Sequence, residues 1–209
     1  MENFITISEN VTKELIEKKS KFIANIFYIE TIEEGEELIK KIQKKYFDAR
    51  HNCFAYRIIT SKGVYEKSSD DGEPSGTAGA PMLNILQKNN ISNILVIVTR
   101  YFGGILLGTG GLVRAYSDSL LLALEKAKKI QKCVGEILQI EVGYNNFEKF
   151  KYCCNKEEVN IIESEFLENI ACKIEIEEDK KEKFLQELEK KGVNLKKKEF
   201  LTKKIITKN

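Results

Sequence analysis

The spacing of hydrophobic residues predicts that the first 130 positions of this 209-residue chain alternate between strands and helices. Residues 20–30 (SKFIANIFYIE) are rich in Phe, Ile and Tyr, which favour a β-strand. Residues 31–49 open on a Thr-x-x-Glu capping signature and place apolar side chains three and four positions apart, as a helix requires. We therefore expect a strand that leads directly into a helix.

Residues 51–60 and 63–69 predict a β-hairpin that turns at residues 61–63. The loop SSDDGEPSGTAGAP (68–81) follows and contains both prolines of the chain. A short helix is expected to begin at its last residue, Pro81, because the missing N–H of proline has no partner in a first helical turn. The loop is thus predicted to connect a strand to a helix.

A continuous apolar run at 91–99 (ISNILVIVT) predicts a strand that is buried on both faces. After a glycine-rich segment, residues 112–130 show helical periodicity over a long stretch. Lys126, Lys128 and Lys129 are expected to close this helix, because cations are stabilised at the negative end of a helix dipole.

The pattern after residue 135 predicts the order strand, helix, strand, strand, helix, strand. This βαββαβ order is typical of the ferredoxin-like arrangement, a two-layer domain. The sequence therefore predicts an α+β fold with two domains, residues 1–133 and residues 134–209. The expected elements of the second domain are 136–142, 145–156, 158–166, 170–178, 179–191 and 193–201.

The charges are balanced overall but unevenly distributed. Residues are 42% hydrophobic and 32% charged, as in a globular protein, and the net charge of +2 does not by itself indicate nucleic acid. Residues 134–195 carry 9 Lys and Arg against 15 Asp and Glu, whereas the tail 196–209 carries 6 against 1. A basic tail predicts a solvated end, with a binding arm as the alternative.

The five cysteines form no C-x-x-C pair, so we predict free thiols in a cytoplasmic protein rather than a disulfide or zinc framework. No apolar run approaches the roughly 18 residues of a membrane span, and the N-terminal residues do not have the pattern of a signal peptide. The expected protein has no membrane partner and no cofactor.

Residues 98–119 (VTRYFGGILLGTGGLVRAYSDS) contain the strongest chemical signal, a buried strand that passes through five glycines into a helix. Glycine lets another group approach the main chain, and free N–H groups at a helix start favour an anion. Because Arg100 and Arg114 flank the loop, we predict a phosphate or carboxylate site there. The alternative is that the glycines only permit tight packing. The predicted site residues are Arg100, Tyr101, Gly103, Gly104, Gly108, Thr109, Gly110, Gly111 and Arg114.

The loop 68–81 offers carboxylates that could bind a hard cation or act as general bases, namely Asp70, Asp71 and Glu73. Turn chemistry explains the same residues, and we favour an acidic turn over a metal site. Ser75 and Thr77 are expected either to donate to a ligand or to cap the next helix.

His51 is the only histidine and precedes Cys53 by two positions in a predicted strand, which places both side chains on one face. A Cys/His nucleophilic pair is one interpretation. We favour a histidine that is structural or touches a ligand, because the sequence indicates no third residue to orient the ring. One histidine without a cysteine pair predicts no transition-metal site.

Three segments, ARHNCFAYRI (49–58), SSDDGEPSGTAGAPML (68–83) and residues 98–119, resemble the IMPACT family in its bacterial, YigZ-type branch. The resemblance covers residues 20–130 closely and extends more weakly over the remainder. It implies an N-terminal domain similar to the second domain of ribosomal protein S5. It also implies a C-terminal ferredoxin-like domain similar to the last domain of a translocase elongation factor.

The resemblance further implies that the acidic and glycine-rich loops meet in one cleft. Eukaryotic relatives regulate translation through an additional domain that this chain lacks, and bacterial members have been suggested to bind nucleic acid. Some members carry the label of proline dipeptidase, which we reject because the chain lacks the His, Asp and Glu set of such a metal site. The candidate cleft residues are His51, Asp71, Glu73, Ser75, Thr77, Arg100, Tyr101, Thr109 and Arg114.

Three functional hypotheses follow. The preferred one is a module that binds RNA or ribosome-associated factors, in which Tyr101 and Phe102 offer a stacking face to bases. The second is an enzyme that acts on a small phosphorylated or carboxylated substrate, with His51 or Asp71 as its base. The third is an adaptor that contacts a protein partner through the acidic C-terminal domain. Between these, we expect binding rather than catalysis.

Overall fold

The computed structural model describes residues 3–60 and 63–208, so the turn predicted at 61–63 lies partly outside the described residues. The described residues form two five-stranded sheets and five α-helices. The chain divides into two compact units, of which the first is Phe4–Ile130 and the second holds Asn3 and the residues from Gln131 onward. The division falls within one strand, β7 (Lys129–Val142).

The sheet of the first unit is antiparallel, in the order β2-β3-β6-β4-β5. Its central strand β6 is buried on both faces, as the apolar run predicts: Val96 and Val98 join one core cluster, and Leu95 and Ile97 join the other. The strands are β2 (Val11–Glu17), β3 (Ser20–Tyr28), β4 (His51–Thr60), β5 (Gly63–Ser69) and β6 (Ile94–Tyr101).

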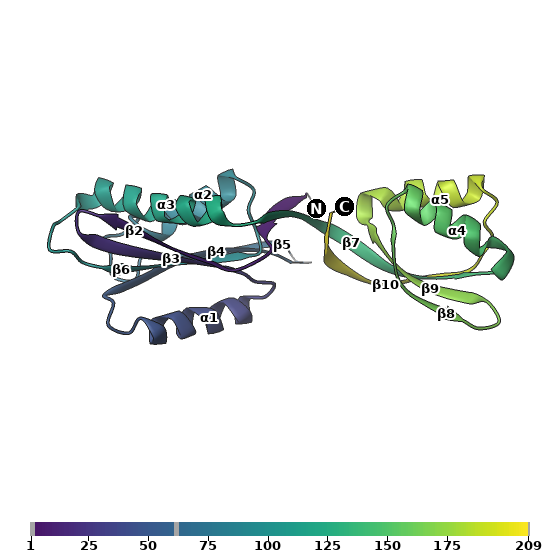
Figure 1. Cartoon of the computed structure of the whole chain (residues 1–209), viewed down its shortest axis with the longest axis horizontal. Helices are drawn as coiled ribbons and strands as arrows, with labels where there is room; N and C mark the ends of the chain where they lie inside the picture. Colours follow the sequence, from purple (N-terminus) through teal and green to yellow (C-terminus); the bar gives the residue numbers. More distant parts are fainter. Residues whose placement is uncertain (1–2, 61–62, 209) are drawn as a thin grey trace. The chain divides into compact units, whose positions relative to one another are not determined.

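Three helices cover this sheet, one on one face and two on the other (Figure 1). The first, α1 (Ile32–Lys45), begins where Thr31 Oγ1 accepts a hydrogen bond from the N–H of Glu34 at 3.1 Å, as the capping signature predicts. On the opposite face lie α2 (Gly79–Lys88) and α3 (Gly108–Lys126). No helix in the described part of the chain is long and apolar enough to cross a membrane.

The structure changes the predicted bounds of α3. The helix begins at Gly108 rather than at residue 112, so four residues of the glycine-rich segment form its first turn. It ends at Lys126, because Ala127 has an extended backbone and Lys129 already begins β7. The expectation that Lys128 and Lys129 close this helix is therefore wrong.

Two strands form where no element was predicted. The short β1 (Phe4–Ile7) hydrogen-bonds through the main chain of Ile5 to that of Asn90 and Ser92. The edge strand β2 alternates half-buried and exposed residues, which is the period of a strand with one covered face. Its scattered charges hid this alternation in the sequence.

The second unit follows the predicted βαββαβ order, and the strand order β10-β7-β9-β8 is antiparallel throughout. The strand β1 also pairs with β7. Two helices cover one face of this sheet, and Phe150 and Phe184 pack between them and the strands. The elements after β7 are α4 (Tyr144–Lys156), β8 (Asn160–Phe166), β9 (Ile170–Glu177), the 3-10 turn η1 (Glu178–Lys180), α5 (Lys181–Lys190) and β10 (Leu195–Thr207).

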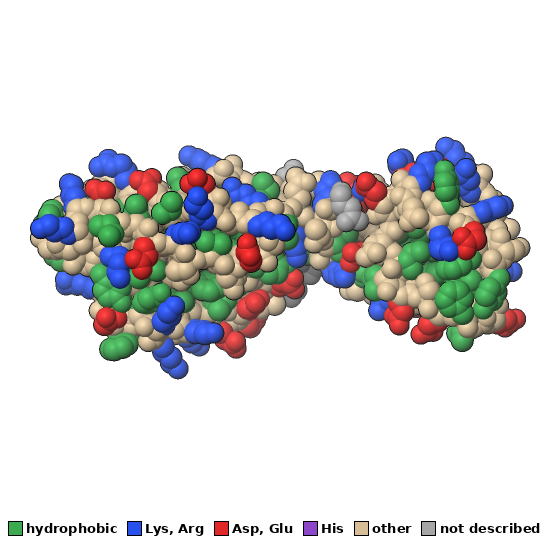
Figure 2. Space-filling model, in the orientation of Figure 1, with side chains coloured by type: hydrophobic (Ala, Val, Ile, Leu, Met, Phe, Trp, Pro, Cys, Tyr) green, Lys and Arg blue, Asp and Glu red, His purple; other side chains and the backbone are tan. Residues whose placement is uncertain are grey.

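Exposed hydrophobic side chains gather near the β8–β9 hairpin (Figure 2), and Phe166 and Tyr144 are among the exposed residues of this unit. Phe166 is 61% exposed, and its ring contacts those of Tyr144 and Phe147 at centroid distances of 6.5 and 5.7 Å. The Tyr144 hydroxyl donates to the carbonyl of Leu167 at 2.8 Å, which ties the first turn of α4 to the hairpin.

The basic tail is not the solvated end that its charge predicts, because β10 pairs with β7 from Leu195 to Thr207. Its lysines form ion pairs with carboxylates of the same unit. Lys204 Nζ lies 2.7 Å from Glu175, and Lys203 contacts Glu178. The opposite charges of residues 134–195 and 196–209 thus partly compensate each other within one unit.

We expect removal of residues 196–209 to abolish the cooperative unfolding transition of the second unit, because one of its strands would be lost. Urea unfolding monitored by circular dichroism measures this. The control Lys203→Gln/Lys204→Gln keeps the strand and removes only ion pairs of half-exposed lysines, which contribute about 1 kcal/mol or less each. If the truncation and the lysine control destabilised the second unit equally, ion pairs rather than strand pairing would hold the tail in place.

Candidate functional site

The acidic loop between β5 and α2 is organised by the carboxylate of Asp70. Its Oδ1 accepts hydrogen bonds from the N–H groups of Ala78 and Gly79 at 2.9 and 2.8 Å, and its Oδ2 accepts one from Gly76 at 2.8 Å. These bonds satisfy N–H groups at the start of α2, which no side chain at the N-cap position serves. The structure therefore favours the acidic-turn interpretation for Asp70.

Asp71 joins the same loop to β4. Its Oδ2 accepts from the N–H of Asn52 at 2.6 Å, and its carbonyl oxygen lies 2.7 Å from His51 Nδ1. No cluster of three or more His, Cys, Asp or Glu suited to a metal occurs among the described residues. Both side chains that the enzyme hypothesis needs as a base are thus engaged with the main chain.

Glu73 lies in a buried network that connects the two motif loops. Its Oε1 accepts from Arg100 Nη1 at 2.7 Å and from the hydroxyl of Tyr116 at 2.9 Å. Glu73 is 9% exposed and Arg100 is 6% exposed, so the ion pair is shielded from water. The Cys53 Sγ completes the chain of contacts, 3.3 Å from the Tyr116 hydroxyl.

Arg100 is fixed on its remaining sides by β3 and by the loop after β6. Its guanidinium carbon lies 5.4 Å from the ring centre of Phe22 and 5.6 Å from that of Phe102, and its Nη2 lies 3.5 Å from Ser20 Oγ. The anion that Arg100 binds is therefore a carboxylate of the chain itself. The acidic loop thus contacts β6 and α3, which flank the glycine-rich loop, and the polar groups at this contact are paired with one another.

Gly103 packs directly on the turn between β2 and β3. A Cβ atom on Gly103 would lie 2.0 Å from the carbonyl carbon of Lys19 and 2.3 Å from the nitrogen of Ser20. The N–H of Gly103 donates to Ser20 Oγ at 3.2 Å. At this position the tight-packing interpretation of the glycines holds.

The first turn of α3 differs from the packed part of the loop. Gly108, Thr109 and Gly110 are exposed, no side chain caps the helix, and its first turn contains no acidic residue. Arg114 lies exposed further along the helix and lines a hollow of about 150 Å³ together with Lys18. The other lining residues are Leu15, Glu17, Leu107, Gly111, Ala115 and Asp118.

The remaining predicted residues have local partners or lie on the surface. The Thr77 hydroxyl donates to the carbonyl of Pro74 at 2.6 Å, and Ser75 and Gly104 are exposed. The Tyr101 hydroxyl donates to Asp48 at 2.7 Å, and this bond raises the pKa of Tyr101 to about 12. Lys21 Nζ lies 5.3 Å from the Tyr101 ring centre.

The structure does not form the Cys/His pair considered from the sequence. His51 is directed to Asp71, whereas Cys53 Sγ lies 2.9 Å from the carbonyl of Asp70. Burial raises the pKa of Cys53 to about 12, so its thiol stays protonated and is a poor nucleophile.

Sequence reasoning missed Lys18 and Ser20, which complete the surroundings of the two loops. Both belong to the hairpin of β2 and β3, whose first strand was not predicted. The sequence signal that could have found them is the polar pair Lys18-Lys19 between two segments of alternating hydrophobicity.

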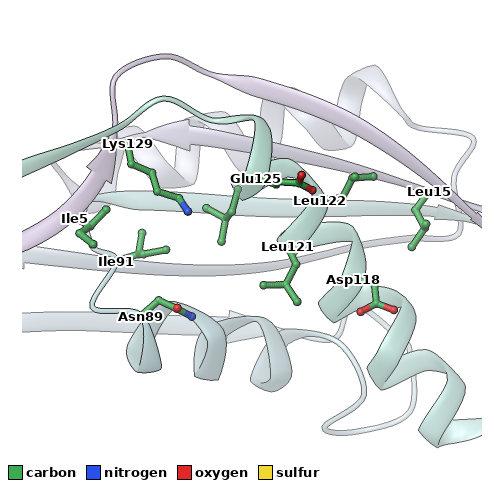
Figure 3. A pocket seen from close by; sticks show the side chains of 10 residues that line it. Ile5, Leu15, Asn89, Ile91, Asp118, Leu121, Leu122, Glu125 and Lys129 are labelled. Carbon is green, nitrogen blue, oxygen red and sulfur yellow. The ribbon is translucent and has the colours of Figure 1, made fainter.

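An apolar hollow of the first unit, with a volume of about 610 Å³, lies elsewhere (Figure 3). Leu121 and Leu122 of α3 line it with Ile5 and Ile91, and Asp118, Glu125 and Lys129 stand around them. None of the predicted site residues lines this hollow. An apolar pocket beside the glycine-rich loop would favour an enzyme. This hollow is not such a pocket, because none of the predicted site residues lines it.

Comparison with known proteins gives two family matches. Residues 18–124 match the Impact N-terminal domain, and residues 140–192 match a domain of unknown function, DUF1949. The chain is 35% identical to the IMPACT family member YvyE of Bacillus subtilis (strain 168), over 85% of this chain and 82% of the relative. It is 39% identical to the IMPACT family member YigZ of Escherichia coli (strain K12), over 60% of this chain and 62% of the relative.

One solved structure is similar over nearly the whole chain. The crystal structure of a hypothetical protein aligns with a TM-score of 0.63 at 29% identity and covers 93% of this chain and 97% of its own. The agreement thus extends over both units.

We expect Glu73→Gln to lower the free energy of unfolding by about 3–5 kcal/mol, because it leaves the Arg100 charge buried without a counter-charge. The double variant Glu73→Leu/Arg100→Met removes both charges and is expected to be less destabilised than Glu73→Gln. Urea denaturation of the wild type and the variants tests this. A double variant as unstable as the sum of Glu73→Leu and Arg100→Met, each measured alone, would argue against the coupling.

Gly103→Ala is expected to destabilise the protein by about 3 kcal/mol, because its methyl group would overlap the Lys19–Ser20 peptide. The matched change Gly110→Ala has room for the methyl group and should raise stability by up to about 1 kcal/mol. Thermal unfolding compares the two, and similar effects would contradict the assigned packing.

The buried thiols should resist modification in the folded protein. Burial raises the pKa of Cys53 and Cys154 to about 12 and that of Cys133 to about 11, above the ordinary value of 9.0. Titration with a disulfide reagent at mildly alkaline pH should therefore find five reactive thiols only after denaturation. Because these pKa values are raised, their contribution to stability should be lost as pH rises from 9 towards 12.

Proposed function

The chain belongs to the IMPACT family, and we propose that its first unit binds RNA or an RNA-containing partner of the translation machinery at the start of α3. The observation that carries the proposal is the hollow of about 150 Å³ in which Lys18 and Arg114 stand beside Gly111. This volume accommodates a phosphate group, and the uncapped first turn of α3 supplies the positive end of a helix dipole.

The backbone of the β2–β3 turn supports a role for its lysines. Lys18 and Lys19 have φ angles of 45° and 64°, a conformation that asparagine and glycine adopt more readily. Each such residue costs about 1–2 kcal/mol. A strained turn that retains two exposed lysines is consistent with a function for those charges.

An exposed aromatic ring lies beside Arg100. Phe102 is 49% exposed and follows directly on the strand that carries Arg100. A ring of this kind can stack on an unpaired base of a single strand. Tyr101, the other predicted stacking residue, has Lys21 close to its ring and is less accessible.

Electrostatics limits the strength of this binding. Glu17 and Asp118 also line the hollow, so its formal charge is zero. Affinity must then come from a few well-placed contacts rather than from a strong positive field. We therefore propose weak binding to single strands, with further contacts supplied by the assembly to which the RNA belongs.

We assign the two domains to fold classes that also occur in translation proteins. We assign residues 1–133 to the class of the second domain of ribosomal protein S5 on the family resemblance. The strand order β10-β7-β9-β8 with two helices on one face supports a ferredoxin-like class for residues 134–209. The five free cysteines support a cytoplasmic setting.

We expect the affinity for a fluorescein-labelled oligouridylate, measured by fluorescence anisotropy, to fall with added salt. Two phosphate contacts to a single strand correspond to a log–log slope of about 1.4. Lys18→Ala/Arg114→Ala should reduce this slope to near zero. The matched control Lys41→Ala/Lys44→Ala removes two exposed charges from α1, on the opposite face of the sheet, and should leave binding unchanged.

A second variant separates binding from folding. Lys18→Asn/Lys19→Gly relieves the strained turn, so it should raise stability by about 1–2 kcal/mol while weakening RNA binding. Binding that survives both this variant and Lys18→Ala/Arg114→Ala would overturn the proposed site.

A further inference from the structure

The strand β10 leaves one edge of the second sheet open. It pairs with β7 along its length, and no other strand in the described part of the chain pairs with it. The strand has 13 residues, and most of its positions are exposed. An edge of this length presents a row of main-chain N–H and C=O groups to which another strand can pair.

A groove runs along the beginning of this edge. It has a volume of about 690 Å³ and lies between α5 and the first residues of β10. Leu185 and Leu188 of α5 contribute apolar surface, as do Val193 and Leu195. An added strand would therefore find a partly apolar surface for the side chains that face α5.

Three consecutive lysines line the same groove. Lys197 forms an ion pair with Glu199 at 2.8 Å, whereas Lys196 and Lys198 form none with any residue that the structure describes. Lys198 lies opposite Ile140, a core residue, so it stands on the face of the sheet that α5 covers. Phe200, two residues further along the strand, is 51% exposed.

We propose that the free edge of β10, with the groove beside α5, binds an extended acidic segment of a partner protein as an added strand. Main-chain hydrogen bonds supply the pairing, and carboxylates on the side of the segment that faces α5 meet Lys196 and Lys198. This interaction is independent of the RNA proposal, because it uses residues of the second unit alone.

The charges favour an acidic peptide over two other occupants, a second copy of this chain and an RNA strand. Two β10 edges from separate copies would oppose five lysines to five with one glutamate each, and like charges across a strand pair are destabilising. An RNA strand would bring a phosphate at every nucleotide towards Glu182 and Glu189, which also line the groove. A peptide places carboxylates only where the lysines stand and offers a main-chain ladder as well.

The test uses the full chain and a fluorescein-labelled peptide of alternating valine and glutamate. We expect saturable binding that slows hydrogen exchange of the β10 amides. Lys196→Glu/Lys198→Glu should weaken the affinity by at least about tenfold. The matched control Lys190→Glu/Lys191→Glu reverses two exposed charges at the end of α5 that do not line the groove, and should bind within about twofold of wild type.

The peptide itself supplies the decisive control. A version methylated on alternate main-chain nitrogens keeps every carboxylate but cannot form the ladder, so it should lose binding. Equal binding of both versions would overturn the proposal in favour of simple charge attraction. Displacement of the peptide by oligouridylate at equal concentration, or concentration-dependent self-association that Lys196→Glu/Lys198→Glu abolishes, would overturn it in favour of RNA or of a second copy.

Discussion

The buried ion pair between Arg100 and Glu73 is the constraint on which the arrangement of the first unit depends. It joins the end of β6 to the acidic loop, and Tyr116 extends the same contact to α3. Removing two charges from water costs several kcal/mol for each ion, and the short contacts to Glu73 only partly offset this. The Nε of Arg100 is buried without a hydrogen-bond partner, which adds to the cost. Because burying this pair costs free energy, the positions that it fixes explain its presence better than a gain in stability does.

In this geometry the carboxylates of the acidic loop are all hydrogen-bonded, whereas part of the glycine-rich loop is exposed. The acidic loop is held by Asp70, Asp71 and Glu73, so its carboxylates serve the fold. The glycine-rich loop is packed at Gly103 and exposed from Gly108 to Gly110. The two interpretations of the glycines, tight packing and access for a ligand, thus apply to different positions of the same segment.

The sequence predicted most elements because their apolar periodicity is strong, as for β6 and α1. It failed where an element is defined by its partner: β2 and the end of β10 are polar edge strands, whose pairing to β3 and β7 depends on residues distant in sequence. For the same reason it suggested that Arg100 binds a foreign anion. Glu73 is 27 positions away and Tyr116 is 43 positions from Glu73, and no local pattern indicates that these three side chains meet.

Charge illustrates the same limit in the second unit. The acidic stretch and the basic tail resemble two interaction surfaces when they are counted along the chain, yet Lys203 and Lys204 are paired with Glu178 and Glu175 once the sheet forms. A partner interacts mainly with the charges that are not neutralised by ion pairs within the folded unit. In β10 that remainder is concentrated at Lys196 and Lys198, beside an open strand edge and a groove. A small residual charge at a geometrically specific position discriminates between partners better than a large diffuse one, because it acts only on a segment that also satisfies the main chain.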